Sequence, residues 1–249
     1  MREKSGEPFI LTDHPAADGT LIVSGGEARH LGRVLRARPG FLFVGFDGQG
    51  NGWLAEVTSV KSDKVAAKVC ERLPPAPPLR LELSAAVGIV KGSRMDWAVE
   101  KACEVGASRL IPLLTEFGVV VPGGGRVERW RQIALSSAKQ SRRLRLMEVE
   151  APTALEQALA ECISKGDVWA LDNSPGCTPL SVMFASIRLP GRLSLFIGPE
   201  GGFSEGERAL FRSRGIPAVG MGERPLRTET AVTVALGTLA NLALAEREG

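Results

Sequence analysis

Hydrophobic and polar positions alternate differently in the two parts of this chain. Up to residue 73, short segments rich in β-branched and aromatic residues are typical of strands. The predicted strands are 20–24, 41–46, 53–60 and 64–71. Asp47-Gly-Gln-Gly-Asn-Gly52 predicts a hairpin turn, and 27–38 has a helical pattern. We therefore expect a small β-barrel with one helix.

A proline-rich segment, Leu73-Pro-Pro-Ala-Pro-Pro-Leu79, follows these strands. Four prolines in seven residues favour extended polyproline geometry, which forms a semi-rigid spacer. We therefore predict a first domain over 1–73, a linker over 74–79 and a second domain over 80–249.

After the linker, predicted strands alternate with helices. The strands are expected near 81–90, 109–114, 144–149, 168–171, 193–197 and 216–219. Thr153-Ala-Leu-Glu156 and Ser204-Glu-Gly-Glu207 have the spacing of capping boxes, in which side chains satisfy the first amides of a helix. Alternation of this kind predicts an α/β domain with a parallel sheet.

The last predicted helix, 228–246, is apolar on nearly every side. Such a helix is expected to be buried all round. The sequence leaves two interpretations open, a central core helix or a surface helix covered by another subunit.

Composition narrows the class of protein. Of 249 residues, 44% are hydrophobic and 24% are charged, as in ordinary globular domains. Four widely spaced cysteines without a C-x-x-C pair, and only two histidines, predict reduced thiols and no metal site. The N-terminus lacks the apolar core of a signal peptide, and no run approaches the roughly 20 apolar residues of a membrane span. We therefore expect a cytoplasmic protein.

Positive charge is concentrated in two places. The net charge is +3, yet 126–145 alone contains seven basic residues and one acidic residue. A second basic cluster lies within 29–38. Such clusters favour phosphate binding, and the low aromatic content of 5% favours a folded RNA recognised by shape. The expected RNA-binding residues are Arg29, Arg33, Arg36, Arg129, Arg142 and Arg143.

Several common enzyme motifs are excluded. Gly202-Phe-Ser-Glu-Gly206 matches the G-x-S-x-G pattern of serine hydrolases, but no histidine follows Ser204, so a helix cap is the better interpretation. The chain has neither a Rossmann G-x-G-x-x-G after a strand nor a P-loop.

Two glycine-bearing loops follow the last two predicted strands. They lie within Leu195-Phe-Ile-Gly-Pro-Glu-Gly-Gly-Phe-Ser204 and Val219-Gly-Met-Gly-Glu-Arg-Pro-Leu-Arg-Thr-Glu-Thr-Ala231. Ligands of parallel sheets bind at the carboxyl ends of strands, where glycines let the backbone approach closely. Each loop also leads into a helix N-terminus, which offers unpaired amides. Although either loop alone could be an ordinary turn, together they predict a binding site.

The two loops also carry a resemblance. Ile197-Gly-Pro-Glu-Gly-Gly-Phe203 and Gly222-Glu-Arg-Pro-Leu-Arg-Thr-Glu-Thr-Ala231 resemble the bacterial 16S rRNA uracil-N3 methyltransferases of the SPOUT superfamily. His30-Leu-Gly-Arg-Val-Leu-Arg36 and Lys91-Gly-Ser-Arg-Met-Asp-Trp97 agree with the same family. The similarity therefore runs from about residue 20 to the C-terminus.

The resemblance implies a PUA-like β-barrel that helps to bind RNA and a SPOUT α/β domain with a trefoil knot. It also implies a homodimer, S-adenosylmethionine as cofactor, and 16S ribosomal RNA or the small ribosomal subunit as partner. The residues that would hold the cofactor are Leu171, Gly198, Glu200, Gly202, Met221, Gly222, Leu226 and Thr230. Pro225 stands where relatives usually carry isoleucine, and Phe117 where an arginine is more usual.

Methylation of uracil N3 needs removal of a proton from an extruded base and stabilisation of the charge that spreads onto its carbonyl oxygens. Arg227 is the expected stabiliser, and Glu229, with Glu200 as second choice, is the expected base. A carboxylate at a helix N-terminus can equally serve the helix itself. Two other functions stay open at this point, a SPOUT ribose 2′-O-methyltransferase and a non-catalytic RNA-binding assembly factor.

Overall fold

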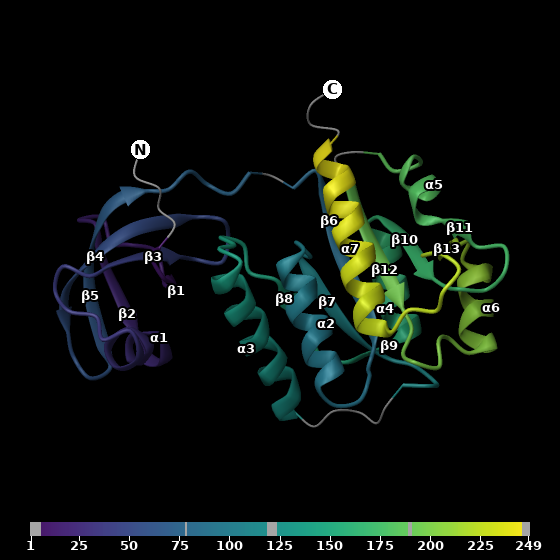
Figure 1. The fold of residues 1–249 in the computed structure, drawn as a ribbon, viewed down its shortest axis with the longest axis horizontal. Helices are drawn as coiled ribbons and strands as arrows, with labels where there is room; N and C mark the ends of the chain where they lie inside the picture. Colours follow the sequence, from purple (N-terminus) through teal and green to yellow (C-terminus); the bar gives the residue numbers. More distant parts are fainter. Residues whose placement is uncertain (1–5, 78, 119–123, 189–190, 246–249) are drawn as a thin grey trace. The chain divides into compact units, whose positions relative to one another are not determined.

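The computed structural model describes residues 6–77, 79–118, 124–188 and 191–245. By its contacts, the chain divides into two compact units (Figure 1). The first consists of Met1–Pro78 with Ala138–Leu146, and the second of Leu79–Ser137 with Met147–Gly249. The segment 138–146, which lies within the predicted second domain, therefore groups with the first unit.

The first unit is built on a five-stranded sheet curled into half a barrel, in the order β1-β3-β4-β5-β2. Its strands are β1 (Phe9–Leu11), β2 (Thr20–Ser24), β3 (Leu42–Phe46), β4 (Gly52–Val60) and β5 (Lys64–Arg72). The four predicted strands and the β3–β4 hairpin are confirmed. The sequence pattern missed β1, which is only three residues long and pairs in parallel with β3.

The predicted helix of the first unit consists of two shorter pieces. α1 (Gly25–Arg29) continues into η1 (His30–Val34), a turn of π-helix. Ala28 and Leu31 are buried against the sheet and belong to its core. The helix ends before Arg36, whose φ of 54° lies in the left-handed region.

The hairpin turn between β3 and β4 anchors two other segments of the first unit. Leu146 N donates to Gly48 O at 2.8 Å, and Gly50 N donates to Leu144 O at 3.0 Å. Ala76 N, in the proline-rich segment, also donates to Gly50 O at 2.9 Å. Because these bonds occupy the backbone around 144–146, the strand expected at 144–149 is reduced to β8 (Glu148–Val149).

The second unit contains an eight-stranded sheet in which every pair is parallel, in the order β11-β13-β10-β12-β6-β7-β8 with β9 beside β7. Its other strands are β6 (Leu81–Gly88), β7 (Arg109–Leu114), β9 (Thr153–Ala154), β10 (Asp167–Leu171), β11 (Thr178–Pro179), β12 (Gly191–Ile197) and β13 (Ala218–Gly220). Its helices are α2 (Ser93–Glu104), α3 (Gly124–Gln140), α4 (Leu155–Lys165), α5 (Leu180–Phe184), α6 (Glu205–Ser213) and α7 (Thr228–Ala245), although the end of α3 from Ala138 on groups with the first unit. The predicted α/β class with a parallel sheet is confirmed.

One of the two predicted capping boxes forms. Ser204 accepts from Glu207 N, and the Glu207 carboxylate accepts from Ser204 N at 2.8 Å, so α6 begins as predicted. The box at Thr153 is wrong. That residue belongs to β9, where strand pairing fixes its backbone, and Ala154 caps α4 without a side-chain bond.

The last helix, α7, packs along β6 and α2 (Figure 1). Val232, Leu236 and Leu239 are fully buried on the inward face. On the outward face, Val234 is 42% exposed and Leu244 is 53% exposed. The interpretation of α7 as a central helix buried on every side is therefore wrong for this chain alone, because Val234 and Leu244 remain exposed.

Candidate functional site

A cavity of about 280 Å³ lies at the carboxyl ends of three neighbouring strands, β12, β10 and β13. Because parallel strands end at the same edge of the sheet, segments distant in sequence meet there. The cavity is lined by Leu171, Asp172, Asn173, Ile197, Gly198, Pro199, Glu200, Gly201, Gly202, Phe203, Arg208, Met221, Gly222, Arg224, Pro225, Leu226, Thr228 and Ala231. Both glycine loops predicted from the sequence contribute to its wall.

The first loop, 198–204, folds back tightly on itself. Gly202 has a φ of +68° and its N–H donates to Pro199 O at 2.8 Å. A Cβ on Gly198 would lie 2.9 Å from the carbonyl carbon of Gly202 and 3.2 Å from Phe203 N. These are backbone atoms that cannot rotate away, so only glycine fits at this position.

The second loop, 221–227, is joined to the first at the start of α7. Thr228 is buried, and its Oγ1 donates to Gly198 O at 3.0 Å. Gly222 has a φ of +115° and the following residues up to Arg227 are exposed. The loop therefore has one fixed end, at Thr228, and a stretch that is open to solvent.

A charged pair forms another part of the wall. Arg208 Nε of α6 donates to Asp172 Oδ2 at 2.9 Å, and Ser174 donates to Asp172 Oδ1 through both its N–H and its hydroxyl. Burial would raise the pKa of Asp172, but these hydrogen bonds and the Arg208 charge outweigh it and lower the pKa below its ordinary value of 3.8. Asp172 is thus an ionised anchor that holds α6 against the end of β10.

We expect Asp172→Asn to lower the free energy of unfolding by about 2 kcal/mol at pH 7, because charged hydrogen bonds are lost. A carboxylate with a lowered folded pKa contributes stability above its unfolded pKa and loses it as the pH falls through the folded pKa. The difference between variant and wild type should therefore shrink below pH 3.8, as urea unfolding across pH 7 to 3 would show. Asp167→Asn, at the exposed start of β10, is the matched control. An equal loss in both variants would contradict this role of Asp172.

A second ion pair holds the rim of the cavity. Arg94, in the first turn of α2, pairs with the carboxylate of Glu200, and both side chains are partly exposed. The sequence pattern gave no indication of this pair, because 106 residues separate its members. The Glu200 carboxylate is therefore already paired with the guanidinium of Arg94.

Seven of the eight residues predicted to hold a cofactor lie in the cavity wall. They are Leu171, Gly198, Glu200, Gly202, Met221, Gly222 and Leu226. Thr230 is exposed on α7 and is not among the described residues of the wall. Sequence reasoning missed Asp172, Arg208 and Thr228, although Asp172 directly follows the strand residue Leu171.

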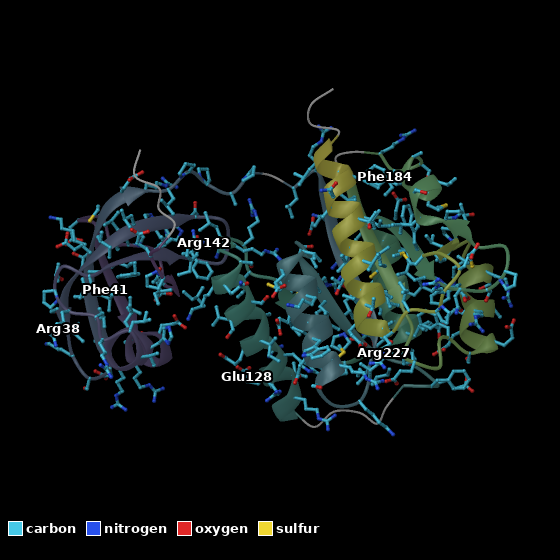
Figure 2. All side chains as sticks on the ribbon, in the orientation of Figure 1. Arg38, Phe41, Glu128, Arg142, Phe184 and Arg227 are labelled. Atoms are coloured by element: carbon cyan, nitrogen blue, oxygen red, sulfur yellow. The ribbon has the colours of Figure 1, made fainter. Side chains whose placement is uncertain are left out.

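The two residues predicted to carry catalysis flank Thr228. Arg227 is exposed at the amino end of α7 (Figure 2). Glu229 is only 8% exposed, and its Oε2 is buried without a hydrogen-bond partner among the described residues. Neither side chain is among the described residues that line the cavity.

The predicted RNA-binding arginines are divided between the two units. Arg29, Arg33 and Arg36 are exposed on or after the helix of the first unit. Arg142 (Figure 2) and Arg143 follow the carboxyl end of α3 and belong to this same unit. Arg129 belongs to the second unit and pairs with Asp96 at 2.8 Å. The first unit therefore carries five of the six predicted residues.

The described residues offer neither a cluster of metal ligands nor a membrane-spanning helix. No group of three or more His, Cys, Asp or Glu side chains in this part of the chain is placed to hold a metal ion. No helix over the described ranges has the length and apolar character to cross a membrane.

Family models match most of the chain. A model described as an RNA methyltransferase domain matches residues 77–240, and one described as an RNA methyltransferase PUA domain matches residues 23–70. A protein of Synechocystis named ribosomal RNA small subunit methyltransferase E is 30% identical over 250 residues, covering 96% of this chain and 80% of that protein. The Bacillus subtilis protein of the same name is 29% identical over 228 residues, which span 88% of this chain and 89% of that protein.

Solved structures show the same similarity in three dimensions. A ribosomal RNA small subunit methyltransferase E of Neisseria gonorrhoeae, bound to S-adenosyl methionine, superposes with a TM-score of 0.85 at 28% identity, over 95% of this chain and 98% of that one. A methyltransferase of Legionella pneumophila in complex with the bound cofactor SAM also gives 0.85, at 27% identity, over 95% and 98%. The fold is thus similar along nearly the whole chain.

Proposed function

Because the chain belongs to the ribosomal RNA small subunit methyltransferase E family, we propose that it transfers a methyl group from S-adenosylmethionine to N3 of a uridine in 16S ribosomal RNA. The observation that carries this proposal is the cavity between the two glycine loops, which lies where a parallel sheet binds its ligands.

The residues of the cavity fit such a cofactor. Gly198 and Gly202 line the cavity without side chains, so a ligand can approach their backbone closely. Each loop also leads into a helix whose first amides can donate to a ligand. Leu171, Met221 and Leu226 supply apolar wall for an adenine ring. S-adenosylmethionine supplies an electrophilic methyl group on a sulfonium. The residues of this chain therefore have to orient the acceptor nitrogen and remove its proton.

Arg227 and Glu229 are the proposed catalytic residues. Arg227 is an exposed cation that can face the carbonyl oxygens beside N3, where negative charge develops. Glu229 has a buried carboxylate oxygen whose acceptor capacity is unused among the described residues, and an N3–H donor would use it. Glu200 is the weaker candidate base because its carboxylate is paired with Arg94.

Isothermal calorimetry with S-adenosylmethionine tests the proposed cofactor. We expect one site per chain. Met221→Glu should abolish binding, because a carboxylate would enter the apolar part of the cavity. Ile163→Glu, on the exposed side of α4, is the matched control and should bind as wild type does. No heat of binding to the folded wild-type protein would contradict the proposal.

The proposed RNA partner predicts a salt dependence. Each phosphate contact releases counterions, so replacing both Arg142 and Arg143 with alanine should reduce the slope of log K against log salt by about 1 to 2. Filter binding of a 16S RNA fragment at several salt concentrations measures this slope. The double variant Arg192→Ala with Arg214→Ala removes the same charge elsewhere and should leave the slope unchanged. Equal slopes for wild type and the Arg142/Arg143 variant would remove this segment from the interface.

We also propose a homodimer that resides in the cytoplasm with its ribosomal RNA substrate. The support for the dimer is the outward face of α7, where Val234 and Leu244 are exposed on an apolar helix. A second copy of the chain would cover this face. Sedimentation of wild type against Val234→Asp is the direct test, with a shift to monomer expected in the variant.

A further inference from the structure

Phe117 lies against the first loop of the cavity. It follows β7 at the carboxyl edge of the sheet, and 52% of it is exposed. A Cβ on Gly201 would lie 3.0 Å from Phe117 Cβ and 3.3 Å from two of its ring atoms. The missing side chain of Gly201 therefore leaves the space in which this ring rests.

The segment that carries Phe117 is fixed to the first turn of α6, which follows this loop. Glu116 N donates to Glu207 Oε1 at 2.9 Å, while the other oxygen of this carboxylate caps α6 through Ser204 N. Gly118 N donates to Thr115 O at 3.1 Å and closes a turn around Phe117. The backbone on both sides of Phe117 is thus fixed by hydrogen bonds.

Phe117 presents an open aromatic surface beside the cavity wall. The chain has no tyrosine and few aromatics, and among the described residues only Trp97 and Phe117 are aromatic side chains that rank as exposed. Phe117 is not among the described residues of the cavity wall, but it lies against Gly201, which is. An open aromatic ring beside a cavity suits a flat partner.

We propose that Phe117 is a positioning residue that stacks on the extruded target base. This inference rests on the proposed function, because an acceptor nitrogen has to leave its helix before it can meet a methyl donor. Unpaired bases of RNA stack on aromatic side chains, and such stacking orients the ring without selecting its hydrogen bonds. Phe117 would fix the plane of the uracil ring, while residues of the two glycine loops contact the edge of the ring.

Steady-state methylation of a 16S RNA fragment by Phe117→Leu and Phe117→Trp tests this assignment. Leucine keeps the apolar bulk but removes the flat face, so kcat/KM for RNA should fall about 10-fold to 100-fold. Tryptophan keeps a flat face, as does the guanidinium plane of Phe117→Arg, and both variants should retain most of the activity. Calorimetry should give the wild-type affinity for S-adenosylmethionine in all three.

Ile163→Ala, which removes an exposed apolar side chain from α4, is the control and should methylate as wild type does. If Phe117→Leu keeps the wild-type kcat/KM, or if its affinity for the cofactor falls in parallel, the stacking role is wrong. Failure of the proposed function is distinguishable, because the wild-type protein itself would then bind no S-adenosylmethionine and methylate no RNA.

Discussion

Replacing Gly198 with alanine is expected to weaken S-adenosylmethionine binding about 10-fold to 100-fold, the cost of forcing one methyl group into a packed site. The new Cβ would lie 2.9 Å from the carbonyl carbon and 3.0 Å from the Cα of Gly202. The first loop would have to open, and the Thr228 hydroxyl that donates to Gly198 O would lose its acceptor. Calorimetry on the folded variant measures the loss.

Gly206→Ala is the matched control for this experiment. Gly206 lies in the first turn of α6, where a Cβ would be 3.7 Å from Ser204 Oγ, an ordinary contact. This variant should bind the cofactor as wild type does, and its helix should be slightly more stable because alanine favours helix over glycine. If Gly198→Ala binds equally well, the close approach of the two backbone segments has no part in the site.

The second large effect is expected for Glu229→Gln. If this carboxylate takes the N3 proton, the amide should reduce the single-turnover rate about 10²-fold to 10⁴-fold, the usual contribution of a general base. The affinity for S-adenosylmethionine should not change, because Glu229 lies outside the cavity wall formed by the described residues. Rapid-quench methylation with enzyme in excess separates this step from product release.

Glu223→Gln is the matched control. It removes a carboxylate from the exposed loop that precedes α7 and should leave the rate unchanged. A purely structural role for Glu229, as a carboxylate at the N-terminus of α7, gives a different result. In that case Glu229→Gln would lower the free energy of unfolding and the cofactor affinity, while the bound fraction would still react at the wild-type rate.

Local sequence patterns predicted the parts of the fold that depend on local physics. Alternating β-branched residues placed β2 to β5, and the glycine-rich turn at 47–52 placed the β3–β4 hairpin. The alternation of strands and helices after residue 80 predicted the parallel sheet, and hence the edge where the two glycine loops meet. The resemblance to a family, and not periodicity, supplied the cofactor and the RNA.

The parts that sequence missed depend on contacts between distant residues. The Thr153 capping box has the correct spacing, but pairing of β9 with β7 decides the backbone there. The pairs Arg94–Glu200 and Arg208–Asp172 join elements that only the folded sheet brings together. The grouping of 138–146 with the first unit likewise depends on bonds to the hairpin turn, such as Leu146 N to Gly48 O.

The central proposed property of this protein is one reaction, transfer of a methyl group to a uracil nitrogen. Its most direct test is mass spectrometry of the nucleosides released from 16S ribosomal RNA after incubation with the protein and S-adenosylmethionine. We predict 3-methyluridine in the treated RNA and none in a reaction with Glu229→Gln at single-turnover times. A ribose-methylated nucleoside in its place, or RNA without any added methyl group, would contradict the account.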